Sequence, residues 1–122
     1  MVRLVQLLDG VPAKRFPLDK ERLTIGRGPG NDIELDDLSV SIRHAVIERI
    51  GDPETAEYHI RDLESTNGTY VNEEPISCRR LHNRDIIRIG WTHFEFIDER
   101  AGQEKTMKIR KTWLPGVFIS KK

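Results

Sequence analysis

The sequence predicts an all-β domain, built as a sandwich or barrel of many short strands. Short runs of alternating apolar and polar residues recur along the chain, and segments rich in Gly, Pro, Asn and Asp separate them. Before residue 99, no stretch places apolar residues at helical spacing over three turns. The 122 residues suit one domain and a tail, so we expect a domain over residues 1–99 and an extension over 100–122.

The first half of the chain contains an opening hairpin followed by three strands. Asp9-Gly10-Val11-Pro12 is a turn between two apolar segments, which makes those segments partner strands. The last strand of this half is rich in β-branched residues and ends at Gly51-Asp52-Pro53, which cannot continue a ladder. The expected strands are residues 4–8, 15–18, 22–25, 33–35 and 45–50.

The second half continues the pattern and ends in a pair of strands. Residues 85–90 and 92–97 have apolar residues that alternate in register with a buried face. Before them lie strand-like runs at residues 58–63 and 70–72 and a brief segment at 75–78. Strand and turn therefore alternate through the whole domain.

Charge and cysteine content exclude several classes of protein. Twenty basic and 20 acidic residues give a formal net charge of zero, so no overall field favours nucleic acid or an anionic membrane. The single cysteine, Cys78, excludes an internal disulfide and a cysteine-based zinc site. No apolar run is long enough to cross a bilayer, and the first residues lack the features of a signal peptide. We therefore expect a cytoplasmic protein.

The extension over residues 100–122 is basic, although the whole chain is neutral. It has one acidic residue, Glu104, and an apolar stretch at residues 113–119. This segment either folds back on the sandwich or docks on a partner or a second copy of the protein. Its cationic residues are Arg100, Lys105, Lys108, Arg110, Lys111, Lys121 and Lys122.

Three polar loops separate the expected strands. Residues 65–69 carry hydroxyls and an amide around Gly68, which can take the positive φ that a tight turn needs. Residues 26–32 place one arginine among glycines, and residues 38–44 carry two serines, Arg43 and His44. If the sheets bring these loops to one edge, the result is a shallow polar site suited to an anion.

The order and spacing of five motifs strongly resemble the forkhead-associated (FHA) domain, over about residues 4–98. The motifs are Ile25-Gly26-Arg27, residues 32–35, residues 40–47, residues 62–72, and Leu81 with residues 85–90. The resemblance implies an FHA-like β-sandwich of about eleven strands, of the small stand-alone bacterial type. It also implies that loops at one end bind phosphothreonine peptides, which would recruit a phosphorylated partner in Ser/Thr kinase signalling.

Position by position, the resemblance assigns four binding residues. Arg27 and Ser41 are similar to the family's phosphate-binding arginine and serine, Asn67 to the asparagine that holds the peptide backbone, and Thr66 to the residue beside it that helps to bind phosphate. Guanidinium and hydroxyl donors suit a dianionic phosphate, and an amide both gives to and accepts from a peptide group. Structural support of the loops is expected from Gly26, His44, Ser65 and Gly68.

The chain departs from the family pattern at a few positions. Ile42 follows the serine, where the family often has a basic or polar residue, and this change removes one phosphate donor. Arg43 points to the opposite side of an extended chain, so Ile42 and Arg43 are possible additional contacts only. Arg84 and Glu73-Glu74 stand where glycines are common, which concerns turn geometry.

Other functions are weaker interpretations of the same residues. Ser41 lies three residues before His44, but there is no strained glycine elbow and no obvious orienting acid, so we expect no enzyme activity. Acidic residues around Ile33 and Leu35 form a solvated face without EF-hand spacing, and no histidines form a close pair, so no metal or cofactor is expected.

The serious alternative is a structural or assembly module that uses the same sandwich and its tail without dependence on phosphate. Ile42 favours that alternative, whereas the set Arg27, Ser41, Thr66 and Asn67 opposes it. In the tail, Thr106 is followed three residues later by Ile109, at the position by which FHA domains tend to choose ligands. Phosphorylated Thr106 is therefore a hypothetical ligand for the loops of a second copy, which would give self-association through the tail.

Overall fold

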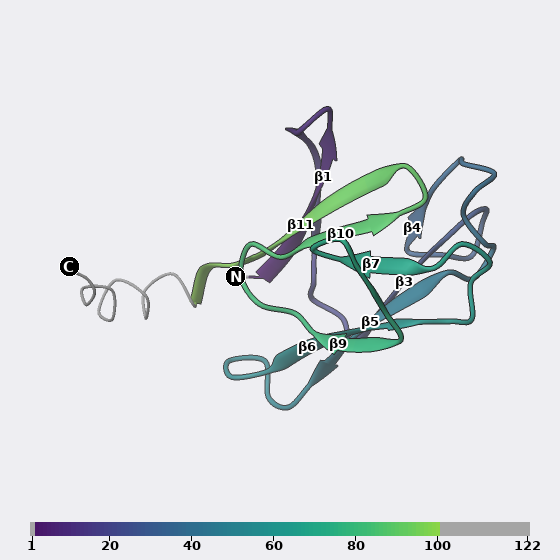
Figure 1. Cartoon of the computed structure of the whole chain (residues 1–122). Coiled ribbons are helices and arrows are strands. Elements are labelled where there is room, and N and C mark those ends of the chain that lie inside the picture. The colour runs from purple at the N-terminus through teal and green to yellow at the C-terminus, as the bar shows by residue number, and fades with distance from the viewer. Residues whose placement is uncertain (1, 101–122) are drawn as a thin grey trace.

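Two β-sheets packed face to face form the domain (Figure 1). The computed structural model describes residues 2–100, and the rest of the basic extension, including Thr106, lies outside that range. The all-β sandwich of about eleven strands is confirmed. Its strands are β1 Val2–Leu8, β2 Val11–Pro17, β3 Arg22–Gly26, β4 Ile33–Glu34, β5 Ala45–Ile50, β6 Glu57–Asp62, β7 Thr69–Val71, β8 Glu74–Ile76, β9 Cys78–Arg80, β10 Ile86–Ile89 and β11 Thr92–Asp98.

Antiparallel pairing dominates both sheets. One sheet has the order β2-β1-β11-β10-β7-β8 and the other β4-β3-β5-β6-β9. The opening hairpin β1–β2 and the final hairpin β10–β11 are both present, and β1 also pairs with β11, so that the first and last strands lie side by side. A short parallel pair of β3 with β4 is the exception among the described strands.

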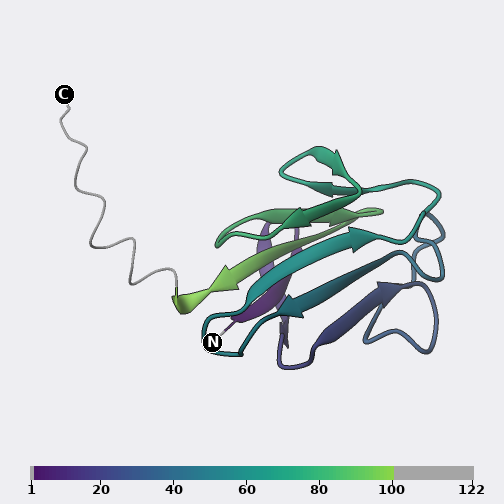
Figure 2. The ribbon, with the colours of Figure 1, turned by 90° about the horizontal axis from the view of Figure 1, so that it is seen from below.

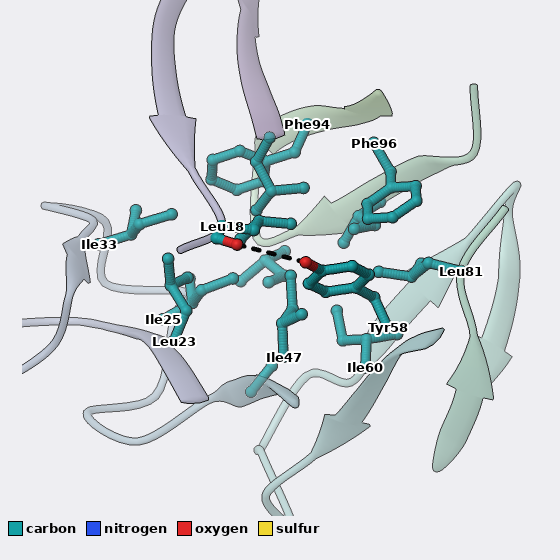
Figure 3. Packing of buried hydrophobic residues seen from close by; sticks show 14 of the residues in the cluster. Leu18, Leu23, Ile25, Ile33, Ile47, Tyr58, Ile60, Leu81, Phe94 and Phe96 are labelled. Atoms are coloured by element: carbon teal, nitrogen blue, oxygen red, sulfur yellow. Dashed lines mark hydrogen bonds between the residues drawn. The ribbon is translucent and has the colours of Figure 1, made fainter. Parts of the chain in front are cut away.

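The core lies between the two sheets and follows from the period-two alternation of the strands. Side chains such as Leu4, Ile25, Ile60 and Phe94 are fully buried. Figure 3 shows aliphatic residues such as Ile25 and Ile60 packed with the aromatic rings, and the Tyr58 hydroxyl donates to the Leu18 carbonyl at 3.4 Å. Burial of this continuous cluster fixes the register of each strand, because a slip of one residue would turn its apolar side chains to water.

The brief segment expected at residues 75–78 contains parts of two strands, β8 and β9. The chain leaves β8 in one sheet and enters β9 in the other, and Ser77 lies between them. Pro75 is tolerated because β8 is an edge strand, where a missing N–H breaks no internal ladder. The carbonyl of Ser77 accepts from the Asp62 N–H at 2.9 Å, which attaches the crossing to β6.

The connections β3–β4, β4–β5 and β6–β7 gather at one end of the sandwich, and the described termini lie at the other end (Figure 2). Arg100, assigned to the extension from the sequence, is attached to the sandwich. Its guanidinium donates to the carbonyls of Pro53, Glu54 and Ala56 at 3.2, 3.1 and 2.9 Å. Within residues 2–100, no helix is long and apolar enough to cross a membrane.

Candidate functional site

The three polar loops enclose a hollow of about 320 Å³ at the end of the sandwich. All four residues that the resemblance assigns to peptide binding contribute to its wall. The lining residues are Arg27, Leu38, Ser39, Val40, Ser41, Ile42, Thr66 and Asn67. The fold therefore brings together residues from β3–β4, β4–β5 and β6–β7 that are far apart in the sequence.

Gly26 allows the end of β3 to lie against the β4–β5 loop. A Cβ at this position would stand 2.1 Å from the Ile42 carbonyl oxygen, which no side chain permits. The neighbouring Arg27 N–H donates to the Ser41 carbonyl at 2.9 Å. This close backbone contact brings Arg27 beside Ser41.

The Arg27 guanidinium is fixed at one end and available at the other. Its Nε donates to the Val40 carbonyl at 2.9 Å. Within residues 2–100, no carboxylate lies within ion-pair distance of Arg27. Because a fixed guanidinium loses little freedom on binding, its terminal N–H groups suit an incoming oxyanion.

The hydroxyl of Ser41 and the amide of Asn67 are oriented by bonds between loops. Ser41 Oγ accepts from the Thr66 N–H at 3.0 Å, which leaves the hydroxyl proton to donate elsewhere. Asn67 Nδ2 donates to the Ser39 carbonyl at 2.8 Å. The amide oxygen of Asn67 therefore remains an acceptor at the rim of the hollow, because it is not the atom used by that bond.

His44 lies beneath the hollow and links two of its loops. The side chain is fully buried, Nδ1 accepts from the Ser41 N–H at 3.0 Å, and Nε2 lies 2.8 Å from the Gly68 carbonyl. Since Nδ1 is an acceptor and a carbonyl cannot donate, the hydrogen-bond network assigns the proton to Nε2. His44 thus joins the β4–β5 loop to the β6–β7 loop.

Asp62 organises the β6–β7 loop from the end of its strand. Its carboxylate accepts from the hydroxyls of Ser65 and Thr69 at 2.6 and 2.7 Å, and Ser65 Oγ accepts from the Gly68 N–H at 2.9 Å. Burial raises the pKa of the Asp62 carboxyl, but the hydrogen bonds from Ser65 and Thr69 outweigh burial and hold that pKa below its usual range. The sequence interpretation assigned Asp62 no role of its own; the three-residue spacing to Ser65 was the available signal.

Ile42 and Arg43 face different hollows. The Ile42 side chain is 58% exposed and lines the hollow of Arg27, next to Leu38, which is 90% exposed. Arg43 does not line that hollow and instead borders a second one on the other side of Ile42. The structure therefore does not bring Arg43 to the candidate phosphate position.

Ser41 and His44 are not arranged as a nucleophile and its base. The backbone N–H of Ser41 bonds to His44 Nδ1, whereas the Ser41 hydroxyl accepts from Thr66 N. Nucleophilic catalysis needs a hydrogen bond from the hydroxyl to the base. Within residues 2–100, no group of three or more His, Cys, Asp or Glu residues is placed to hold a metal ion.

Comparison with known proteins gives a matching family and several relatives. The FHA domain pattern matches residues 23–90. An oxoglutarate dehydrogenase inhibitor from Corynebacterium jeikeium is 46% identical over 84 residues, which cover 69% of this chain and 56% of the relative. The glycogen accumulation regulator GarA from Mycolicibacterium smegmatis is 42% identical over 83 residues, or 68% of this chain and 50% of the relative. The chain thus spans about half the length of the curated relatives that it matches.

Solved structures show the same sandwich. The FhaA FHA domain, complexed with the intracellular domain of Rv3910, has a TM-score of 0.68 and 33% identity over 79% of this chain and 99% of that domain. Mycobacterium tuberculosis EmbR, in complex with a low affinity phosphopeptide, has a TM-score of 0.68 and 39% identity over 79% of this chain and 24% of that protein. From the matched pattern, the two-sheet fold and these relatives, we conclude that the chain belongs to the FHA domain family.

Proposed function

We propose that the protein binds phosphothreonine peptides in the hollow between its three polar loops, and so recruits a phosphorylated partner in Ser/Thr kinase signalling. The observation that carries this proposal is the meeting of Arg27, Ser41, Thr66 and Asn67 in one hollow. Arg27 is a cation without a carboxylate partner among the described residues, and the others present hydroxyl and amide groups.

Each residue has a role that follows from its chemistry. A phosphothreonine carries roughly −1.5 to −2 charges near neutral pH and three acceptor oxygens. The terminal N–H groups of Arg27 and the hydroxyls of Ser41 and Thr66 donate to those oxygens. The amide oxygen of Asn67 accepts a hydrogen bond from a backbone N–H of the peptide. This bond holds the peptide beside the phosphate and does not depend on the peptide sequence.

Binding without catalysis is part of the proposal. The oxoglutarate dehydrogenase inhibitor and the glycogen accumulation regulator are relatives with regulatory names, which supports a regulatory role for this chain. The partner is a phosphothreonine-containing protein, either a Ser/Thr kinase or one of its substrates. We place this activity in the cytoplasm, where the exposed thiol of Cys78 stays reduced.

An assembly module that ignores phosphate is the second candidate. Its support is the apolar rim that Leu38 and Ile42 give the hollow, because exposed apolar side chains suit an unphosphorylated surface. Ile42 also supplies no hydrogen-bond donor to a phosphate. The two functions differ in one measurable property, the dependence of affinity on the phosphate group.

Titration calorimetry with a degenerate phosphothreonine peptide library and its unphosphorylated twin tests the proposal. We expect binding to the phosphorylated library, and a loss of about tenfold to a hundredfold for Arg27→Ala, as expected for a hydrogen bond to a charged group. Arg15→Ala, an equal loss of charge on the exposed strand β2, is the matched control and leaves affinity within about twofold. Equal binding of both libraries would support the assembly module instead.

A further inference from the structure

A second hollow, of about 350 Å³, lies directly beside the candidate phosphate site. Ile42 borders both hollows and therefore forms the ridge between them. The second hollow contains two arginines, a hydroxyl and an amide. Its lining residues are Arg22, Thr24, Pro29, Gly30, Asn31, Ile42, Arg43 and Leu63.

Two acidic residues near this hollow form ion pairs with other cations. Asp32 accepts from Lys20 and from the Thr24 N–H, at 2.5 and 2.8 Å. Glu48, which is near enough to Arg22 to interact with its charge, forms its ion pair with Arg61 at 3.0 Å. Neither of these carboxylates therefore forms its ion pair with an arginine of the hollow.

Arg22 and Arg43 have no carboxylate within ion-pair distance among residues 2–100. Both side chains are exposed, and they come from different elements, since Arg22 begins β3 and Arg43 lies in the β4–β5 loop. Both arginines line the same hollow, and each presents a planar fork that matches a phosphate or a carboxylate.

The wall of the second hollow is fixed before any ligand arrives. Asn31 Nδ2 donates to the carbonyls of Gly28 and Ile42 at 3.1 and 2.9 Å, which ties the β3–β4 loop to the ridge. Gly30 adopts φ +96°, and a Cβ there would meet no atom within 4 Å, so the loop stands clear of the space beside it. These bonds hold the β3–β4 loop beside Ile42 without the help of a ligand.

We propose that this hollow is a subsite for a second anionic side chain on the phosphothreonine peptide, either an acidic residue or a second phosphorylated residue. The inference rests on the proposed function, because the peptide reaches the subsite by crossing Ile42. Successive residues of an extended peptide advance about 3.3 Å, so a chain held at Asn67 carries its neighbouring side chains over adjoining surface. The preferred ligand is then a phosphothreonine peptide with a second negative charge at a fixed spacing.

A positional scan identifies this spacing and the chemical source of the charge. One peptide series carries a single glutamate at each position around the phosphothreonine in turn, on an otherwise neutral background, and a matched series carries phosphothreonine at those positions. We expect one position, or two adjacent ones, to raise affinity by about tenfold, as one further charge-assisted contact would. A gain in both series identifies any anion as sufficient, and a gain in the second alone identifies a phosphate subsite.

The double variant Arg22→Gln/Arg43→Gln tests the residues. We expect it to lose the gain from the second charge and to bind the singly phosphorylated neutral peptide within about twofold of the wild type, because neither arginine lines the first hollow. Arg15→Gln is the charge-matched control and keeps the gain. In heteronuclear NMR, the backbone amides of Gly30 and Asn31 shift with the doubly charged peptide and not with the neutral one.

The outcomes separate the two proposals. Phosphate-dependent binding that needs Arg27, with no position giving a gain above about twofold, overturns the subsite alone. A gain that survives in Arg22→Gln/Arg43→Gln overturns the assignment of these arginines. Binding that does not depend on the phosphothreonine overturns the proposed function, and the subsite with it.

Discussion

Replacing His44 by alanine tests whether one buried side chain holds both the core and the site. His44 has no exposed surface, and its two ring nitrogens bond to the Ser41 N–H and the Gly68 carbonyl. In His44→Ala both backbone groups lose their partner. A buried polar group left unsatisfied costs about 1–3 kcal/mol, and the cavity left by the ring adds to that cost.

The expected loss in the free energy of unfolding is about 3–5 kcal/mol, out of the 5–15 kcal/mol typical of a small domain. Urea unfolding followed by circular dichroism measures it. His82→Ala is the matched control, because that side chain is 66% exposed and has one long contact to Asp85, at 3.9 Å. We expect His82→Ala to change stability by no more than about 0.5 kcal/mol.

The same substitution also distinguishes an effect on the binding site from an effect on the stability of the core. In the folded fraction of His44→Ala, the Ser41 amide loses its acceptor, so its hydrogen exchange accelerates and phosphopeptide affinity falls by more than the unfolded fraction explains. The reasoning would be refuted if His44→Ala had a free energy of unfolding within about 1 kcal/mol of the wild type and an unchanged affinity for the phosphopeptide. The two hydrogen bonds of His44 would then stabilise neither the core nor the loops.

Three further outcomes follow from the structure. Gly26→Ala forces a Cβ against the Ile42 carbonyl, so we expect the free energy of unfolding in urea to fall by about 1–3 kcal/mol and peptide binding to weaken. Wild-type stability together with wild-type binding would contradict the close approach of Gly26 to Ile42. Arg84 has φ 79°, in the left-handed region, where glycine is not strained. Arg84→Gly also removes the ion pair with Glu95 at 3.0 Å, but the arginine side chain is 71% exposed, so that pair adds little stability. We therefore expect Arg84→Gly to raise the free energy of unfolding by up to about 1 kcal/mol, seen as a higher urea midpoint, and a lower midpoint would contradict this expectation. Asp62→Asn should cost about 1–3 kcal/mol at neutral pH, because it weakens the bonds from Ser65. The pKa of Asp62 is lowered in the folded state, so its contribution to the free energy of unfolding is complete above the unfolded pKa of about 3.9. That contribution is lost as the pH falls through the folded-state pKa, so the difference in stability between the wild type and Asp62→Asn should disappear in acid. A difference that does not depend on pH would exclude the carboxylate as its cause.

The strands could be predicted from the sequence because each buries one face. Period-two alternation is a local property, and the hairpins at both ends of the domain have turns marked by glycine. From the sequence, the three polar loops could be expected to meet only if the sheets placed them at one edge. The pairing of β3, β5 and β6 in one sheet is what places them there.

Other features depend on contacts between distant segments, which no local pattern carries. The change of sheet at Ser77 is set by which edge strand finds a partner, and the attachment of Arg100 to the β5–β6 loop joins residues more than 40 positions apart. The hollow of Arg22 and Arg43 likewise depends on which carboxylates pair elsewhere, since the sequence contains ample acidic residues nearby.

The placement of the described termini opposite the loops limits which segments can reach the binding site. Strand β6 runs along the sandwich, and its six residues at roughly 3.3 Å each span about 20 Å. Thr106 lies six residues beyond Arg100, and a link of that length covers at most about 20 Å when fully stretched. A phosphate on Thr106 would therefore reach the loops of its own copy only by a taut, straight path, whereas the loops of another molecule impose no such limit. Association through Thr106 should accordingly rise with protein concentration, and a fusion or surface tether attached at Arg100 would leave the site facing solution.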